Sequence, residues 1–146
     1  MSADSVPGMR RRAFVLVNRA VNVVVRRLGL RRFRGGGLLL LTTVGRKTGQ
    51  PRTTPLLYLA EEGRWIVVAS NGGADWEPGW WLNLRAGSPG TVKIDGTSMH
   101  VSGTELDGPE RETVWARLNA EVFDYESYQR KVSRRLAVVA LAPAQA

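Results

Sequence analysis

The chain has 146 residues, no cysteine and one histidine, and its formal net charge is +8. This length fits one domain, and a content of 43% hydrophobic and 23% charged residues is typical of a globular protein. The lack of cysteine excludes disulfides, iron–sulfur clusters and a thiol nucleophile, and the single His100 excludes a multi-histidine metal site. We therefore expect no metal site, and we expect any catalysis to depend on an organic cofactor.

The basic residues are concentrated in the first third of the chain. Residues 1–52 contain 12 lysines and arginines and one acidic residue, whereas residues 53–146 contain 9 basic and 12 acidic residues. Such asymmetry indicates an anionic partner, which is either nucleic acid, an anionic lipid, or a small molecule carrying phosphate or carboxylates. No nucleic-acid-binding motif is present, so we expect no nucleic acid partner.

The N-terminal segment is predicted to be a tail followed by a helix. Residues 1–9 contain Ser, Asp, Pro and Gly and are predicted to be disordered. Residues 10–34 form a basic segment in which apolar residues recur at helical spacing, which predicts an amphipathic helix. This helix either packs on the domain or rests on an anionic membrane surface. No segment has the features of a membrane span or a signal peptide, so the predicted location is cytoplasmic, with peripheral attachment to the inner face of the cell membrane as the alternative.

The remainder, residues 35–146, is predicted to be one barrel domain. In chain order we predict strands at Leu38–Thr43, Arg52–Ala60 and Arg64–Ser70, a helix at Asp75–Arg85, strands at Thr91–Asp95 and Thr97–Leu106, helices at Pro109–Val122 and Asp124–Arg135, and a strand at Leu136–Leu141. The Asp95-Gly96 pair is a strong hairpin signal. About six mostly antiparallel strands with flanking helices predict a small closed or half-closed barrel, in the mainly β or α+β class.

Two glycine-rich segments could contact a ligand. Arg46, Lys47 and Arg52 cluster around a turn bounded by Gly45 and Gly49, and such cations suit a phosphate or a carboxylate. The alternative is a solvated hairpin tip. The second segment, residues 69–73, ends a predicted strand with Gly72-Gly73 and could offer backbone N–H groups, although an ordinary surface turn has the same composition.

Two aromatic groups could line a pocket. Trp80 and Trp81 with Asn83 could frame a planar ring, and Tyr125 and Tyr128 share one helix face with a hydroxyl each. For both groups, packing against the barrel is the alternative. No role is assigned to His100.

Four sequence blocks carry a resemblance to a known family. They are Leu39–Leu57 (LLLTTVGRKTGQPRTTPLL), Val67–Gly73 (VVASNGG), Gly79–Leu84 (GWWLNL) and Asp124–Arg130 (DYESYQR). In this order and spacing they resemble the deazaflavin-dependent nitroreductase family of actinobacteria, over roughly residues 10–142. The resemblance implies a split β-barrel of the FMN-binding type. It also implies hydride transfer from reduced coenzyme F420, a deazaflavin with a phosphate and a polyglutamate tail, to an electron-poor acceptor such as a quinone, a nitroaromatic or an activated double bond.

The resemblance also implies roles for individual residues. The phosphate and acidic tail would be held by Arg46, Lys47, Thr48 and Arg52, with Thr53, Thr54, Pro55, Leu56 and Leu57 continuing that wall. The ring would lie along Val68, Ala69, Ser70 and Asn71, and Gly79, Trp80, Trp81, Leu82 and Asn83 would close its pocket. Tyr125, Tyr128 and Ser70 would face the acceptor, with Tyr125 or Ser70 as the proton donor.

The chain departs from the family pattern at two positions near the expected pocket. Asn71 stands where many members have Lys, and Glu77-Pro78 stands where members often have His-Pro. These changes leave the physiological acceptor open. An FMN-dependent oxidoreductase of the same barrel, and a non-catalytic module that binds a cofactor or a membrane surface, remain alternatives. The oligomeric state is not predicted.

Overall fold

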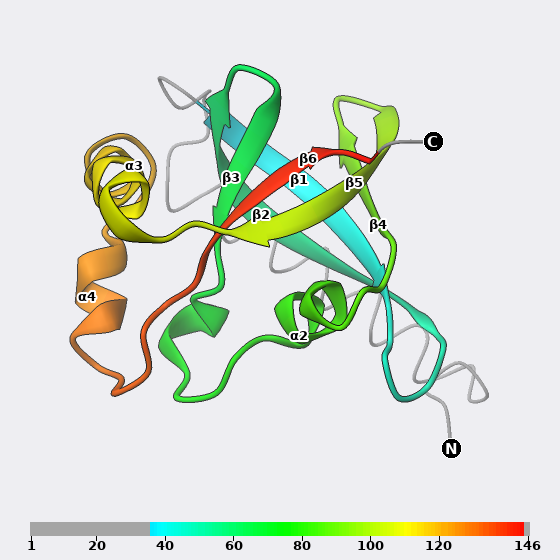
Figure 1. The fold of residues 1–146 in the computed structure, drawn as a ribbon, viewed down its shortest axis with the longest axis horizontal. Helices are drawn as coiled ribbons and strands as arrows, with labels where there is room; N and C mark the ends of the chain where they lie inside the picture. Colours follow the sequence, from blue (N-terminus) through cyan, green and yellow to red (C-terminus); the bar gives the residue numbers. More distant parts are fainter. Residues whose placement is uncertain (1–35, 145–146) are drawn as a thin grey trace.

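The described chain forms a closed six-stranded antiparallel barrel with helices packed on it (Figure 1). The computed structural model describes residues 36–144, so the predicted tail 1–9 and helix 10–34 lie outside the described residues. The strands are β1 (Gly36–Val44), β2 (Pro51–Glu61), β3 (Arg64–Val68), β4 (Gly90–Ile94), β5 (Thr97–Glu105) and β6 (Val138–Pro143). Their order is β1-β2-β3-β6-β5-β4, and the barrel closes because β4 also pairs with β1. The predicted barrel of about six antiparallel strands is confirmed.

Alternation of side chains along β1 builds one wall of the barrel interior. Leu39, Leu41 and Thr43 are buried, whereas the residues between them are only partly buried, as expected when successive side chains point to opposite faces of a strand. The Asp95-Gly96 turn that joins β4 and β5 has both residues at positive φ, 49° and 81°, which suits a tight hairpin.

Strand β6 is buried on both faces, which explains its continuous apolar sequence. Val139 and Leu141 belong to the cluster inside the barrel, whereas Val138 and Ala140 belong to a second cluster formed with the helices outside it. The strand lies between β3 and β5. Strand β3 is divided in the same way, with Val67 in the cluster inside the barrel and Ile66 and Val68 in the second cluster.

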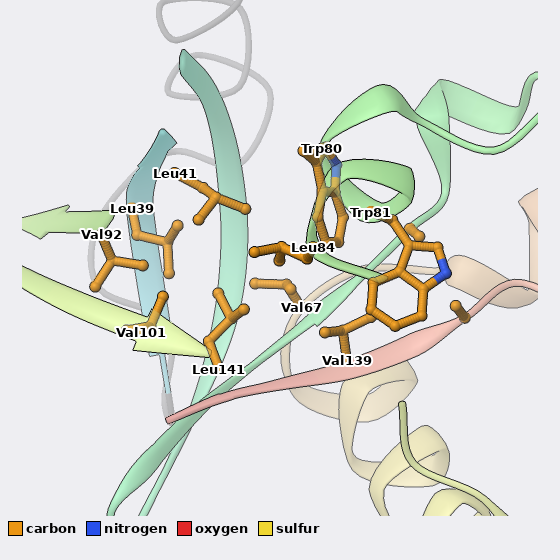
Figure 2. Packing of buried hydrophobic residues seen from close by; sticks show 12 residues of the cluster. Leu39, Leu41, Val67, Trp80, Trp81, Leu84, Val92, Val101, Val139 and Leu141 are labelled. Carbon is orange, nitrogen blue, oxygen red and sulfur yellow. The ribbon is translucent and has the colours of Figure 1, made fainter. Parts of the chain in front are cut away.

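Helix α2 (Gly79–Arg85) packs against the barrel interior. Figure 2 shows Trp80, Trp81 and Leu84 directed toward the leucines and valines of the strands. Glycine at positions 90 and 103 makes room for this helix, because a Cβ atom there would lie 3.0 and 3.1 Å from methyl groups of Leu84. Both tryptophans are therefore core residues.

Two predicted helices are shorter in the structure than in the sequence analysis. The helix expected from Asp75 begins only at Gly79, because Pro78 has extended backbone and a residue that precedes proline is disfavoured in the α conformation. A short 3₁₀ turn, η2 (Asn71–Gly73), comes before it.

The helix predicted over Asp124–Arg135 is also too long. Helix α4 (Tyr125–Gln129) ends early, because the Gln129 side chain donates to the Arg134 carbonyl and accepts from the Leu136 amide, which holds the next residues in a turn. Helix α3 (Gly108–Glu121) agrees with the prediction, with Pro109 in its first turn. No helix of the described part has the length and apolar character required to cross a membrane.

Candidate functional site

A cavity of about 630 Å³ lies where β2, the end of β3, α2 and α4 come together. Four segments that are distant in sequence supply its walls. The predicted site residues that line it are Arg52, Thr54, Pro55, Leu56, Leu57, Val68, Ser70, Asn71, Gly79, Trp80, Asn83, Tyr125 and Tyr128. The cavity therefore brings together most of the expected ring-binding and acceptor-side residues.

Four lining residues have no place in the sequence-based site. Leu38, Gly72, Pro78 and Phe123 also border the cavity. Gly72, Pro78 and Phe123 are neighbours of predicted site residues, and this adjacency is a signal that could have found them. Leu38 could not have been found in this way, because it enters the wall through pairing of β1 with β2, opposite Leu57.

The turn between β1 and β2 lies outside the lining of this cavity. Arg46, Lys47 and Thr48 are exposed there. The hydroxyl of Thr48 accepts a hydrogen bond from the Gln50 amide at 3.2 Å. Arg46 instead borders a smaller hollow of about 330 Å³ beside the C-terminal end of α2. The predicted phosphate-binding cations are therefore split between the cavity, where Arg52 lies, and the adjoining turn.

Four other predicted residues also lie away from the cavity lining. Thr53 is exposed and shares a hydrogen bond of 2.7 Å with Thr42. Ala69 and Trp81 are buried in the barrel core, and Leu82 is partly buried. These positions support the walls rather than form them.

Asn83 joins the cavity to the turn. Its side chain is only 3% exposed. Its carbonyl oxygen accepts from the backbone amide of Arg46 at 3.1 Å and from the Arg46 guanidinium at 3.0 Å. Its amide nitrogen donates to the Thr43 hydroxyl at 3.0 Å. Because both lone pairs of this oxygen are engaged, Asn83 holds Arg46 and the turn against α2, and only its second amide hydrogen remains for a ligand.

The loop after β3 has an unusual backbone conformation. Asn71, Gly72 and Gly73 all have positive φ, at 48°, 63° and 86°. Asn tolerates this left-handed region better than other side-chain-bearing residues. The Asn71 side chain also donates to the Trp76 carbonyl at 3.1 Å, which closes the loop on itself. Asn71 therefore fits this backbone, where a lysine would be strained.

Three aromatic residues on α4 and just before it form another part of the cavity lining. The rings of Phe123 and Tyr125 are 5.4 Å apart, and those of Phe123 and Tyr128 are 5.2 Å apart. Burial, with a smaller contribution from Tyr128, raises the pKa of Tyr125 well above its ordinary value of about 10. Tyr125 lines the cavity, and its hydroxyl, which is protonated at neutral pH in any tyrosine, stays protonated to a higher pH here.

Glu77, the acidic residue expected near the pocket, is paired. Its carboxylate accepts from the guanidinium of Arg85 at 3.1 Å. Its negative charge is therefore compensated by a cation on α2, and it does not line the cavity.

Comparison with known proteins identifies similar chains. A family model described as F420H(2)-dependent quinone reductase matches residues 11–143. An F420H(2)-dependent quinone reductase of Mycobacterium tuberculosis is 35% identical over 106 residues, which are 70% of this chain and 71% of that protein.

Two solved structures have similar folds and sequences. One is an F420-H2-dependent reductase with 32% identity and a TM-score of 0.63, covering 71% of this chain and 92% of that one. Another, described as a domain-swapped dimer, has 28% identity and a TM-score of 0.64, covering 88% of this chain and 98% of that one.

Proposed function

The chain belongs to the F420H(2)-dependent quinone reductase family, and from this membership we propose how its cavity serves the reaction. The protein is an oxidoreductase that uses coenzyme F420 and transfers a hydride to a quinone. We propose that the deazaflavin ring occupies the cavity between β2, the Ser70–Asn71 segment and Trp80. The observation that carries this proposal is the meeting of these three walls with Tyr125 and Tyr128 in one cavity.

The residues present fit such a cofactor. A cavity of about 630 Å³ is within the usual range for a small-molecule site, and its leucine, proline and tryptophan walls suit a flat ring. Arg52 lies at the cavity, and Arg46 and Lys47 lie on the turn that precedes β2. Such a row of cations matches a phosphate followed by carboxylates. The single available amide hydrogen of Asn83 could donate to a polar atom of the ring.

The reduced cofactor supplies the hydride, and the protein supplies position and environment. Leu56, Leu57 and Val68 keep water from the reacting centre, while Trp80 limits how the ring can tilt. The Tyr125 hydroxyl is protonated at neutral pH, and because Tyr125 lines the cavity we expect it to donate a hydrogen bond to an acceptor oxygen where negative charge develops. The Ser70 hydroxyl lines the same cavity and is the second candidate donor.

A fluorescence titration with coenzyme F420, run beside FMN and repeated at high salt, tests the cofactor assignment. We expect saturable binding of F420 that weakens with salt, and oxidation of the reduced coenzyme when a naphthoquinone is added. Binding of FMN alone would support the alternative FMN-dependent enzyme. Binding of F420 without quinone turnover would support a non-catalytic cofactor-binding module.

Arg52→Ala tests the place of the acidic part of the cofactor. We expect a loss of about 1.5–3 kcal/mol in binding free energy, because a hydrogen bond to a charged group is removed. Lys93→Ala is the matched control, since Lys93 is an exposed cation on β4 that does not line the cavity. Equal affinities of the two variants for F420 would contradict the proposed position of the phosphate and tail.

We also propose that residues 10–34 attach the protein to an anionic membrane surface. This segment holds nine arginines and no acidic residue, and its apolar residues have helical spacing. Such attachment would bring the cavity to a lipid-soluble quinone. Sedimentation of the full chain with anionic vesicles, but not with neutral ones, and its reversal by salt would support this proposal. Equal sedimentation with both would contradict it.

A further inference from the structure

Arg134 lies in the turn between α4 and β6, and its guanidinium contacts the loop that follows β3. One terminal nitrogen donates to the Ala69 carbonyl at 3.0 Å, and the other donates to the Ser70 carbonyl at 3.1 Å and to the Ala74 carbonyl at 3.0 Å. The Nε atom also donates to the Ala74 carbonyl, at 3.2 Å. One side chain thus binds both ends of the loop that contains Ser70 and Asn71.

The planar geometry of the guanidinium suits this arrangement. Its N–H groups project in fixed directions within one plane. Hydrogen bonds from them to three carbonyls therefore fix the position of the loop more closely than the ammonium group of a lysine could. Because a trans peptide group is planar, the N–H groups of Ser70 and Asn71 point away from the carbonyls that Arg134 binds. No described residue accepts a hydrogen bond from either of these two N–H groups, and both Ser70 and Asn71 line the cavity.

The same turn is attached to α4, which carries the two tyrosines. Gln129 donates to the Arg134 carbonyl at 2.7 Å and accepts from the Leu136 amide at 2.9 Å. Gly73, inside the loop, lies so close to the Tyr128 ring that a Cβ atom there would be 3.1 Å from it. Arg134 therefore connects two parts of the cavity wall, the loop that contains Ser70 and the helix that carries the tyrosines.

We propose that Arg134 is a positioning residue, which holds the Ser70–Asn71 wall at the distance from Tyr125 and Tyr128 that hydride transfer requires. It does not line the cavity, so it acts through the loop rather than on a ligand. This inference rests on the proposed function for the identity of the ligands. The connection itself depends only on contacts within the chain.

Steady-state kinetics of Arg134→Met and Arg134→Lys, with Arg135→Met as control, test the proposal. Arg135 is the adjacent cation, and it pairs with exposed Asp107 at 3.3 Å. We expect both Arg134 variants to lose about tenfold or more in kcat/KM for the quinone, because small displacements of reacting groups reduce rates steeply. The control should stay within twofold of the unmodified chain. If Arg134→Lys restores full activity, charge alone suffices and the positioning role is wrong.

Amide hydrogen exchange of the ligand-free proteins gives a readout independent of the cofactor. We expect faster exchange in peptides covering residues 69–75 of Arg134→Met, with the barrel strands and the melting temperature nearly unchanged. Exchange and kinetics both equal to those of the control would overturn the proposal.

The two proposals fail in different ways. If the unmodified chain does not bind coenzyme F420, the proposed function fails, and the exchange experiment still decides whether Arg134 holds the loop. If the unmodified chain turns over and the Arg134 variants match it, only the positioning role fails.

The titration also distinguishes which ligand depends on the loop. Weaker binding of coenzyme F420 by Arg134→Met would show that the loop positions the cofactor ring. A lower kcat/KM for quinone with unchanged F420 affinity would place it on the acceptor. Both results support positioning.

Discussion

Tyr125 is buried among the residues of the second cluster and also lines the cavity. Its side chain is 5% exposed and packs against Phe123 and Trp115, with ring separations of 5.4 and 6.3 Å. Trp115 is held in turn by a hydrogen bond from its indole N–H to Glu126 and by the guanidinium of Arg111, 5.1 Å from its ring. Packing therefore limits the motion of the Tyr125 ring.

Replacing Tyr125 with Phe should slow the reduction of the quinone without weakening the binding of the cofactor. The ring and its packing remain, whereas the hydrogen bond to a developing negative charge is lost. We expect kcat/KM for the quinone to fall by roughly tenfold to a hundredfold, corresponding to about 1.5–3 kcal/mol, while the affinity for coenzyme F420 stays within about twofold. Wild-type kinetics in Tyr125→Phe combined with a loss in Ser70→Ala would identify Ser70 as the donor instead.

At the scale of elements, the loop between β3 and α2 packs closely against helix α4. Gly73 has a φ of 86°, and its lack of a side chain allows Tyr128 to approach its backbone. Gly72 has a φ of 63°, but no atom lies within 4 Å of its missing Cβ. Gly72 is therefore needed only for its backbone conformation, whereas Gly73 is needed both for its backbone conformation and to leave space for Tyr128.

Alanine at these two positions should have unequal effects. Gly72→Ala should lower the free energy of unfolding by about 1–2 kcal/mol, because a side chain in the left-handed region is strained. Gly73→Ala should cost about 1 kcal/mol more, since the new methyl group also displaces Tyr128. Urea denaturation measures the stabilities, and the KM for quinone should rise in Gly73→Ala because Tyr128 is displaced. Equal stabilities and equal KM values would show that Tyr128 does not depend on this contact.

Considered as a whole molecule, the barrel and the N-terminal segment differ in charge. Residues 36–144 contain 12 basic and 12 acidic residues, so the entire excess of +8 lies in residues 1–35. If the proposed site is right, attraction of an anionic cofactor to the barrel is therefore local, at Arg46, Lys47 and Arg52, rather than a property of its overall charge. Several acidic residues elsewhere are paired, as in the Glu61 carboxylate, which binds both Arg64 and Arg117.

The stability of the whole fold should depend on Tyr125 at alkaline pH. Its pKa is raised in the folded state, so above about pH 10 the unfolded chain loses this proton while the folded chain retains it. The folded state then binds more protons, and the free energy of unfolding must fall as pH rises through this range. Denaturation at pH 8 and pH 11 should show a smaller loss of stability in Tyr125→Phe than in the wild type. An identical loss in both would show that this tyrosine does not contribute.

Much of the fold could be predicted from local sequence patterns. Alternating burial along β1, the continuous apolar run of β6 and the Asp95-Gly96 turn each follow from the geometry of one strand or hairpin. Helix ends were predicted less well. The end of α4 depends on Gln129, whose amide binds residues five and seven positions away, and no helical periodicity reveals such a contact.

The residue types of the candidate site could be predicted from the sequence, but the tertiary structure decided how these residues are arranged. The sequence by itself determined the six-stranded barrel, the family and the residue types that suit a deazaflavin with an acidic tail. Only the folded chain shows that Asn83 holds Arg46 across 37 positions and that Arg134 binds the Ser70 carbonyl across 64. Such contacts have no periodic signal, because they arise when barrel closure brings distant segments together. Each of the two side chains also binds a backbone group, the Arg46 N–H and the Ser70 carbonyl, and such a partner leaves no mark in the residue type.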